Sequence, residues 1–259
     1  MDTISIGKHN PLLADIRKAI QRGALTSGGL LPIEGPRLVQ EAYASGITIE
    51  TLLLREGTSI ADLPPASVRY TLELGAFKGV QDTEHSQGVI ALVRPRVWTL
   101  DQVLLSRQAP VAVLGGLQDP GNVGTILRVV ESFNGGGCLG LSGTVSVHNP
   151  KVVRASAGSV FRLPHAWNLS FENMVDTLRA KKIPLVGTSP YAADTLMSWD
   201  WSRPAAILIG NEGSGLSSSQ VSACSAVLQI PHAPQTESLN SAIAAAVVFY
   251  EAARGRSLP

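Results

Sequence analysis

From Pro110 onward, short apolar runs alternate with segments of helical periodicity, and this alternation restricts the fold more than any other feature of the chain. The run Val111–Leu114 is continuously apolar, as expected of a strand buried on both faces. Similar strands are predicted at 138–141, 183–187, 205–209 and 227–230, with helices after the first loop and at 171–181 and 239–253. Strands that alternate with helices predict an α/β fold with a mostly parallel sheet covered on both faces.

The chain up to about residue 96 predicts a smaller α/β module. Helices are expected at 11–22 and from Pro36 to about Gly46, and strands at 30–33, 47–54 and 89–93. A short helix is expected at 101–108. We therefore predict an accessory domain at 1–98, a linker at 99–109 and a larger domain at 110–259. Inside the larger domain, Asn149 and Pro150 predict the start of a single helix over 151–159.

Composition points to an enzyme with a buried core. Of the 259 residues, 44% are hydrophobic and 16% charged, which favours a folded protein over a disordered one. No apolar run approaches the roughly 18 residues of a membrane span, and the first residues lack the pattern of a secretory signal. Cys138 and Cys224 do not have zinc-site spacing, so we expect no metal and a cytoplasmic location. The net charge of +1 gives no basic run, so any nucleic-acid-binding patch must be assembled by folding.

The first loop that could carry chemistry is 117–124, which leads into a helix bearing Arg128. Its glycines allow a ligand to approach the backbone closely, and a helix N-terminus favours anions. A tight turn, a helix cap and a solvated arginine explain the same residues equally well. The dinucleotide fingerprint Gly-x-Gly-x-x-Gly is absent from this stretch.

Two further loops follow predicted strands. Three glycines surround Glu212 in the stretch 208–216, where the carboxylate could hold a hydroxyl or a cationic group; a plain turn is the alternative. The flanks of Ser214 do not match a hydrolase nucleophile elbow. In the third loop, His232 is better explained as a loop histidine than as a base. Ser238 is predicted to cap the last helix, with Asn240 in its first turn.

Together, the three loops resemble the three motifs of the SpoU (TrmH) family of S-adenosylmethionine-dependent RNA 2′-O-ribose methyltransferases. The resemblance rests on Asn122 and Arg128, on Ile209-Gly210-Asn211-Glu212-Gly213, and on Ile230-Pro231 with Ser238-Leu239-Asn240, in the family's order and spacing. It spans about residues 111–254, and segments 151–159 and 187–190 also resemble the family. Segments 33–39 and 86–91 resemble, more weakly, the accessory ribosomal-protein-like α/β domain of its members.

The resemblance implies a parallel-sheet SPOUT methyltransferase domain whose C-terminal part forms a deep trefoil knot, and a homodimer. It implies S-adenosylmethionine as the cofactor and structured RNA as the substrate, with ribosomal RNA favoured over transfer RNA. No periodicity in the sequence predicts the knot, which is an exception among folds. The motif match assigns to the cofactor site Thr188, Gly210, Ile230, Leu239 and Asn240.

The resemblance also implies roles for individual side chains. Arg128 would be the principal catalytic residue, either as the base that takes the hydroxyl proton or as the group that binds the neighbouring phosphate and orients the hydroxyl. The first role is the harder one, because a guanidinium resists deprotonation. Arg154 is expected to contact RNA phosphate or to form a structural ion pair, and Arg37 is a further RNA-binding candidate. Catalytic site positions are also matched by Asn122, Glu212, Ser238 and Asn240.

The sequence departs from the family pattern at two places and leaves two other classes of protein to consider. His232 stands where many relatives carry an aliphatic residue or methionine, and Ser241 replaces a common valine. A catalytically silent RNA-binding module of the same fold would be expected to lack Arg128, Asn122 or the glycine loop, and all three are present. A nucleotide-dependent oxidoreductase would need a dinucleotide fingerprint, which is not found.

Overall fold

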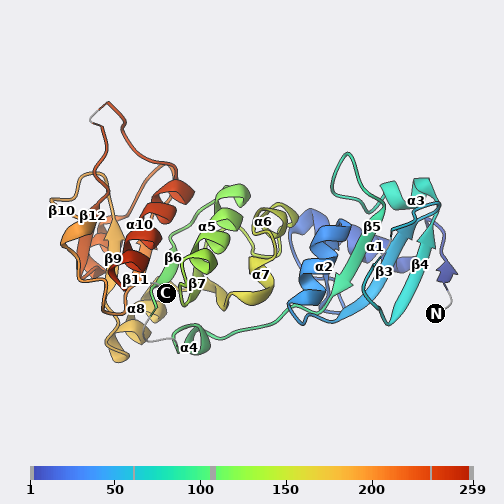
Figure 1. Cartoon of the computed structure of the whole chain (residues 1–259), viewed down its shortest axis with the longest axis horizontal. Helices are drawn as coiled ribbons and strands as arrows, with labels where there is room; N and C mark the ends of the chain where they lie inside the picture. Colours follow the sequence, from blue (N-terminus) through green and yellow to red (C-terminus); the bar gives the residue numbers. More distant parts are fainter. Residues whose placement is uncertain (1–2, 61, 106–108, 234, 257–259) are drawn as a thin grey trace. The chain divides into compact units, whose positions relative to one another are not determined.

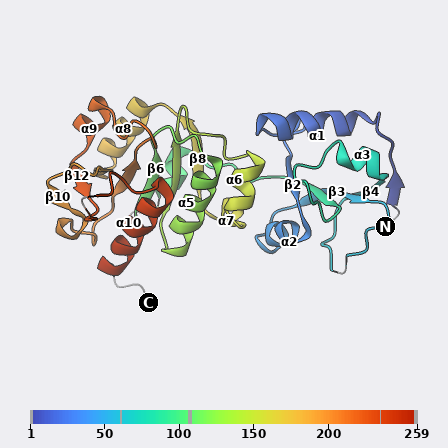
Figure 2. The same cartoon turned by 90° about the horizontal axis from the view of Figure 1, so that it is seen from above.

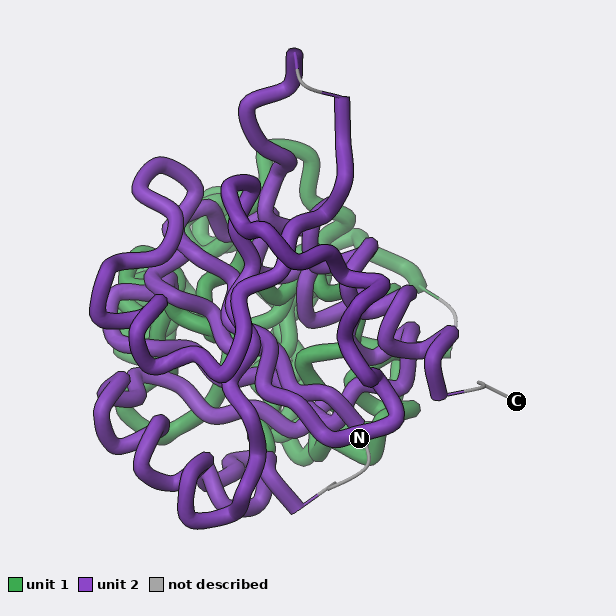
Figure 3. Tube along the Cα trace, turned by 90° about the vertical axis from the view of Figure 1, so that its left-hand side faces the viewer, with its two compact units in different colours: residues 1–96, 146–162 green, residues 97–145, 163–259 purple. Residues whose placement is uncertain are grey.

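The computed structural model describes residues 3–60, 62–105, 109–233 and 235–256. Contacts within the chain divide it into two compact units, shown in green and purple in Figure 3. Unit 1 comprises residues 1–96 together with 146–162, and unit 2 comprises 97–145 and 163–259. The segment 146–162 therefore packs with the N-terminal unit, although the sequence places it in the larger domain.

Unit 1 is built on a five-stranded mixed sheet with the strand order β1-β4-β3-β5-β2. β5 runs antiparallel to β2 and β3, whereas β4 runs parallel to β1 and β3. The elements of residues 3–93 are β1 (Thr3–Ser5), α1 (Pro11–Arg22), β2 (Leu31–Glu34), α2 (Pro36–Ala44), β3 (Ile49–Arg55), β4 (Val68–Leu72), α3 (Leu74–Lys78) and β5 (Val89–Val93).

Helices cover both faces of this sheet (Figure 2). On one face, Leu13 and Ile16 of α1 and Phe77 of α3 pack with Leu53 and Ile90 of the sheet in a buried cluster. On the other face lies α2, which contacts β2 and β5. Each helix has an apolar stripe of the kind that packs on a sheet.

The segment 146–162 forms two short helices in place of the single helix predicted over 151–159. They are α6 (Pro150–Ala155), capped as predicted by Asn149, and α7 (Ser159–Arg162). The chain breaks between them because Ala157 and Gly158 have φ angles of 48° and 91°, in the left-handed region. Within unit 1, α6 contacts β2, Arg154 forms an ion pair with Asp82, and Arg162 forms one with Glu41 at 3.1 Å.

Unit 2 contains a seven-stranded sheet with the order β10-β12-β9-β11-β6-β7-β8, and all its strand pairs are parallel. This confirms the predicted parallel α/β architecture. Its elements are α4 (Leu100–Val103), β6 (Val111–Leu114), α5 (Pro120–Ser132), β7 (Gly137–Leu141), β8 (His165–Leu169), α8 (Phe171–Ala180), β9 (Leu185–Thr188), β10 (Asp194–Thr195), the 3₁₀ turn η1 (Leu196–Ser198), β11 (Ala206–Ile209), α9 (Ser218–Ala223), β12 (Ala226–Gln229) and α10 (Ser241–Gly255). Residues 106–108 of the predicted linker helix lie outside the described residues.

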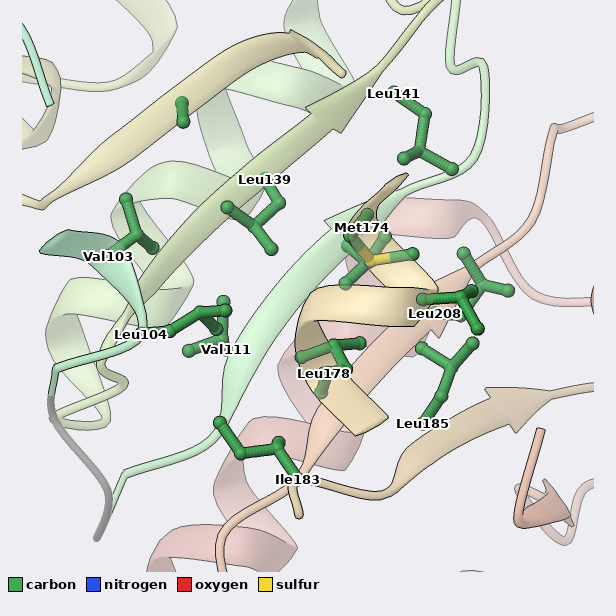
Figure 4. Close-up of a cluster of buried hydrophobic side chains, with 14 residues drawn as sticks. Val103, Leu104, Val111, Leu139, Leu141, Met174, Leu178, Ile183, Leu185 and Leu208 are labelled. Carbon is green, nitrogen blue, oxygen red and sulfur yellow. The ribbon is translucent and has the colours of Figure 1, made fainter. Parts of the chain in front are cut away.

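The helices of unit 2 lie on both sides of the sheet (Figure 2), with α8 and α9 on one side and α5 and α10 on the other. A buried cluster joins Met174 and Leu178 of α8 to Val111, Leu139 and Leu208 of the sheet (Figure 4). On the opposite side α10 packs against α5 (Figure 1). None of the helices in the described part of the chain is long and apolar enough to span a membrane.

Leu178→Ala tests the packing of α8 on the sheet. Leu178 is 1% exposed, so the truncation should leave a cavity and lower the free energy of unfolding by about 2–5 kcal/mol. The measurement is the urea unfolding curve followed by circular dichroism. Asp176→Ala on the same helix, which removes only an exposed ion pair with Arg179, should change the value by less than about 0.5 kcal/mol.

Candidate active site

The carboxyl ends of β6, β9, β11 and β12 lie at one edge of the parallel sheet, where ligands gather in such folds. The loops that follow β9, β11 and β12 surround a pocket of about 560 Å³, a size typical of small-molecule sites. The wall contains Thr188, Gly210, Ile230, Leu239 and Asn240, the residues predicted to hold a cofactor. Their shared position agrees with that expectation, and their roles stay predictions.

The loop after β6 is held against the end of β11. The Gly115 backbone N–H donates to the Ile209 carbonyl at 2.9 Å. A Cβ on Gly115 would lie 3.1 Å from that carbonyl oxygen, so glycine permits the close approach. The loop ends at Asp119, which caps α5 by accepting a hydrogen bond from the Asn122 N–H at 2.8 Å. Asn122 therefore lies in the first turn of α5.

The loop after β11 is organised by Asn211, which sequence reasoning did not select as a site residue. Its backbone pairs with that of Gly215 in a short antiparallel bridge. Its side-chain oxygen accepts from the N–H groups of Gly213 and Ser214 at 3.0 and 3.3 Å, and its Nδ2 donates to the Gly116 carbonyl at 2.8 Å. Asn211 thus shapes its own loop and ties it to the loop after β6. An asparagine directly before a glycine-rich turn was the available signal.

The N-cap of α10 differs from the predicted one. The helix begins at Ser241, and its N-cap is Asn240, whose Oδ1 accepts from the N–H groups of Ala242 and Ile243 at 2.9 and 3.2 Å. The prediction that Ser238 caps this helix is wrong, because Ser238 lies two residues too early. Ser238 instead forms part of the pocket wall.

A chain of side-chain hydrogen bonds connects three predicted site residues. Asn240 Nδ2 donates to Asn122 Oδ1 at 3.0 Å, and Asn122 Nδ2 donates to Glu212 Oε1 at 3.3 Å. The direction of the chain follows from its ends. The backbone N–H groups of α10 require Oδ1 of Asn240, so its NH₂ must face Asn122, and the NH₂ of Asn122 must then face the carboxylate of Glu212. Glu212 also receives the Gln118 N–H at 3.5 Å.

The predicted RNA-contacting arginines lie apart from this hydrogen-bond chain. Arg128 is on α5, six residues after Asn122; it is exposed and, within the described part of the chain, has no hydrogen-bond or ion-pair partner. It does not belong to the pocket wall. Arg37 on α2 and Arg154 on α6 belong to unit 1. Arg37 is exposed, whereas Arg154 forms the ion pair with Asp82, which was the structural alternative for this residue.

The charges of the pocket wall indicate what kind of ligand fits. Its charged side chains are the carboxylates of Glu212 and Glu237, and no lysine or arginine is among the described residues that line it. Apolar side chains, such as Leu228 and Ile230, lie beside neutral polar ones in the wall and provide a surface on which a flat ring can lie. His232 binds the Ile230 carbonyl through Nδ1 at 2.6 Å, as a loop histidine would. A ligand with a positive charge and a flat aromatic ring, such as S-adenosylmethionine, fits this wall better than a pyrophosphate does.

Neither cysteine is a thiolate nucleophile at neutral pH. Burial raises the pKa of the Cys138 thiol far above its usual value. Burial also raises the pKa of the Cys224 thiol to about 11, against a smaller opposing effect of a hydrogen bond from the Gly187 backbone. Both thiols therefore stay protonated. Within the described residues, no group of three or more His, Cys, Asp and Glu side chains is placed to hold a metal ion.

Comparison with known proteins identifies the family. The model of the SpoU rRNA Methylase family matches residues 109–250. An uncharacterized tRNA/rRNA methyltransferase of Synechocystis is 35% identical over 95% of this chain and 91% of its own length. The 23S rRNA (guanosine(2553)-2′-O)-methyltransferase RlmP of Bacillus subtilis is 29% identical over 93% of this chain and 95% of its own.

The fold leads to the same family. The SpoU methyltransferase AviRb from Streptomyces viridochromogenes, solved in complex with AdoMet, superimposes with a TM-score of 0.86. It is 25% identical and covers 96% of this chain and 98% of its own. The chain belongs to the SpoU rRNA methylase family, and the predicted family and enzyme class, a methyltransferase, are confirmed.

Gly210→Ala tests whether the loop after β11 needs a glycine at its start. A Cβ on Gly210 would lie 2.6 Å from the Gly215 carbonyl carbon, which is backbone and cannot swing away. We expect the free energy of unfolding to fall by about 1–3 kcal/mol. Gly213→Ala is the matched control in the same loop, because its Cβ would meet only Asn211 Oδ1 at 3.7 Å. Equal stability of the two variants in urea unfolding would contradict the proposed crowding.

Proposed function

We propose that this protein transfers a methyl group from S-adenosylmethionine to a ribose 2′-hydroxyl of ribosomal RNA. The observation that carries the proposal is the hydrogen-bond chain Asn240–Asn122–Glu212 beside an acid-lined pocket, in a chain of the SpoU family. Ribosomal RNA is favoured over transfer RNA because RlmP, named for 23S rRNA, matches nearly the whole chain, unit 1 included. The Synechocystis relative is named for both RNAs, so transfer RNA is the alternative substrate.

The pocket residues suit the cofactor chemically. When bound, S-adenosylmethionine supplies a methyl group that its sulfonium makes transferable. Thr188, Gly210, Ile230, Leu239 and Asn240 would hold it, largely through backbone groups and apolar contacts. Thr188 Oγ1 donates to the Leu208 carbonyl at 3.3 Å, which steadies the end of β9 next to β11. The carboxylate of Glu212 lies in the wall, where it favours a positive ligand.

For the reaction itself, the protein has to orient a weak nucleophile and manage its proton. The ribose oxygen would form a bond to the methyl carbon as the carbon–sulfur bond breaks, and the hydroxyl proton would pass to Arg128 if that residue acts as the base, or otherwise to water. Orientation of the hydroxyl supplies much of the rate in such reactions. Arg128 either takes the proton or binds the adjacent phosphate and holds the hydroxyl in line. We favour the second role, because an exposed guanidinium keeps its proton and binds phosphate well. This reaction needs no metal.

Asn122, Glu212 and Asn240 would act as positioning residues. Asn122 lies in the first turn of the helix that carries Arg128, so its bonds to Glu212 and Asn240 fix the start of α5 relative to the pocket. Ser238 lies in the pocket wall, within reach of a substrate that enters there.

The C-terminal part would form the deep trefoil knot of the family. The strand order supports this proposal: β12 pairs with β9, and the chain then returns to place α10 against α5. Residues of the loop after β11 and of the segment before α10 line the same pocket, as two threaded segments would. A knotted backbone would hold the loops of the pocket together without a disulfide.

Unit 1 would serve as the accessory RNA-binding domain. Arg37 supports this role, because it is exposed on α2 and has no ion-pair partner in the described part of the chain. Arg154 would add a phosphate contact only by sharing its charge with Asp82. A cytoplasmic location is consistent with an RNA substrate and with two free cysteines.

The protein would act as a homodimer through α10. Ile243, Val247 and Tyr250 are 55%, 37% and 56% exposed and follow a helical spacing, so they form an apolar stripe. The Tyr250 ring lies edge-on against Phe133, at the end of the neighbouring helix α5. Apolar stripes of this kind mark interfaces, and a second copy with the same stripe would cover it by two-fold symmetry.

Arg128→Ala should lower the rate of methyl transfer to ribosomal RNA at least about a hundredfold, because the guanidinium that orients the hydroxyl is lost. Arg128→Lys should not restore the activity, since lysine lacks the planar fork that binds phosphate. The measurement is the transfer of label from radiolabelled S-adenosylmethionine to ribosomal RNA, followed by mapping of the 2′-O-methylated nucleotide.

Arg179→Ala is the matched control, an exposed arginine on α8 on the other side of the sheet, and it should keep full activity. If the wild type labels no RNA and does not bind S-adenosylmethionine, the silent RNA-binding module is the better account; binding of the cofactor without transfer would point to a missing substrate or partner. Label in transfer RNA alone would favour the alternative substrate.

Val247→Glu should convert the dimer to a monomer, because it places a charge inside the proposed apolar interface. Light scattering coupled to size-exclusion chromatography gives the mass directly. Arg179→Glu, a larger charge change on α8, should leave the dimer intact. A wild-type protein that is monomeric at micromolar concentration would contradict the proposed dimer.

A further inference from the structure

Ser241 has an unusual environment at the edge of the pocket. It is the first residue of α10, is 8% exposed, and forms part of the pocket wall. Its Oγ is enclosed and has no hydrogen-bond partner within the described part of the chain. A buried hydroxyl without a partner is unfavourable, and such groups are rare in folded proteins. The residue is therefore expected to gain a partner when the pocket is filled.

The backbone of Ser241 offers a second unused donor. In the first turn of α10, the N–H groups of Ala242 and Ile243 are taken by Asn240 Oδ1, and that of Ala244 by the Asn240 carbonyl. The Ser241 N–H has no such partner among the described residues. Both hydrogen-bond donors of Ser241, its backbone N–H and its Oγ–H, thus lack an acceptor within the described residues. They lie at the N-terminus of a 15-residue helix, the end with a partial positive charge. This combination selects an anionic acceptor.

The rest of the wall has the opposite charge. Glu212 and Glu237 carry its carboxylates, and no lysine or arginine among the described residues of the wall balances them. A simple anion such as phosphate would be repelled by these carboxylates. A zwitterion suits both regions, with its anionic group at the start of α10 and its cationic groups near the acidic side chains.

We infer that Ser241 binds the α-carboxylate of the amino-acid part of S-adenosylmethionine, through its backbone N–H and, after rotation about χ1, its Oγ–H. The inference rests on the proposed function and assigns a residue that the sequence comparison singled out only as a departure from the family pattern. Serine χ1 has three staggered wells, so the hydroxyl can leave its enclosed position at small cost. The ammonium and sulfonium groups would then face the acidic part of the wall.

The test compares two ligands that differ only in the carboxylate. Calorimetry measures the Kd of S-adenosylmethionine and of decarboxylated S-adenosylmethionine for the wild type and for Ser241→Ala. The wild type should prefer the carboxylated ligand. In Ser241→Ala, the Kd of S-adenosylmethionine should rise about tenfold, the size expected for one hydrogen bond to a charged group. The Kd of the decarboxylated ligand should change by less than about twofold, because that ligand has no carboxylate for the lost hydroxyl to bind.

Two further variants distinguish the loss of the hydroxyl from a disturbance of the fold. Ser241→Thr and Ser241→Val have nearly the same shape and differ in the hydroxyl, so only the threonine variant should keep the preference for the carboxylated ligand. Ser218→Ala, which removes an exposed hydroxyl on α9 from a residue outside the pocket wall, should leave the Kd of both ligands within about twofold.

The outcomes distinguish this inference from the proposed function. A wild type that binds neither ligand overturns both. A wild type that binds S-adenosylmethionine, with Ser241→Ala binding it equally well, overturns the role of Ser241 and leaves the methyltransferase proposal intact. The same holds if the alanine and valine variants weaken both ligands equally, since a carboxylate contact cannot act on a ligand without a carboxylate.

Discussion

The parallel pairing of β11 with β6 is the constraint on which the site depends. It joins Leu114 to Ile209 in register and so brings together two loops from distant parts of the chain. The ladder continues one step further, because the Gly115 N–H donates to the Ile209 carbonyl, and the Asn211 side chain then reaches the Gly116 carbonyl across a separation of 95 residues. A slip of one residue in this pairing would turn every side chain of the strand to the other face. The buried apolar residues on both faces make such a slip costly, so the core sets the register and the register sets the site.

The hydrogen bonds of the site do not themselves stabilise the fold to any great extent. Asn122, Glu212 and Asn240 are at the surface, where a hydrogen bond contributes about 0.5–1.5 kcal/mol. The distances between these side chains are instead set by the helices and strands that carry them. Asn122 lies in the first turn of α5, Asn240 caps α10, and these two helices pack side by side on the sheet (Figure 1). Because both side chains are anchored at helix starts, small movements of the loops should leave their mutual distance unchanged.

The parts of the fold that the sequence predicts are those with a continuous apolar signal. The strands Val111–Leu114 and Val89–Val93 were predicted to the residue, because buried strands have no polar positions to blur their ends. β8 was missed: it lies at the sheet edge, and its sequence His-Ala-Trp-Asn-Leu has neither an apolar run nor a regular alternation. The break between α6 and α7 was missed because Ala157 adopts a positive φ, which a residue with a side chain rarely does. In the site, the motif match selected Asn122, Glu212 and Asn240 as site residues. Asn211 lies in the same motif but was not selected, because its bond to the Gly116 carbonyl depends on two loops that only the folded sheet brings together.

The placement of charge explains how a chain with a net charge of +1 can handle both a cationic cofactor and an anionic polymer. The described residues that line the pocket include two carboxylates and no lysine or arginine, which suits a sulfonium and disfavours RNA phosphate inside the cofactor site. The arginine proposed to meet the RNA, Arg128, lies outside that wall on the exposed side of α5. The opposite charges therefore lie in different places: Arg128 is exposed on α5, whereas Glu212 lies in the pocket wall and accepts a hydrogen bond from the neutral amide of Asn122. Because the hydrogen-bond partner of Glu212 in this chain is a neutral amide, its carboxylate keeps a negative charge that can attract the cofactor, and the guanidinium of Arg128, which has no ion-pair partner within the described residues, stays available for phosphate.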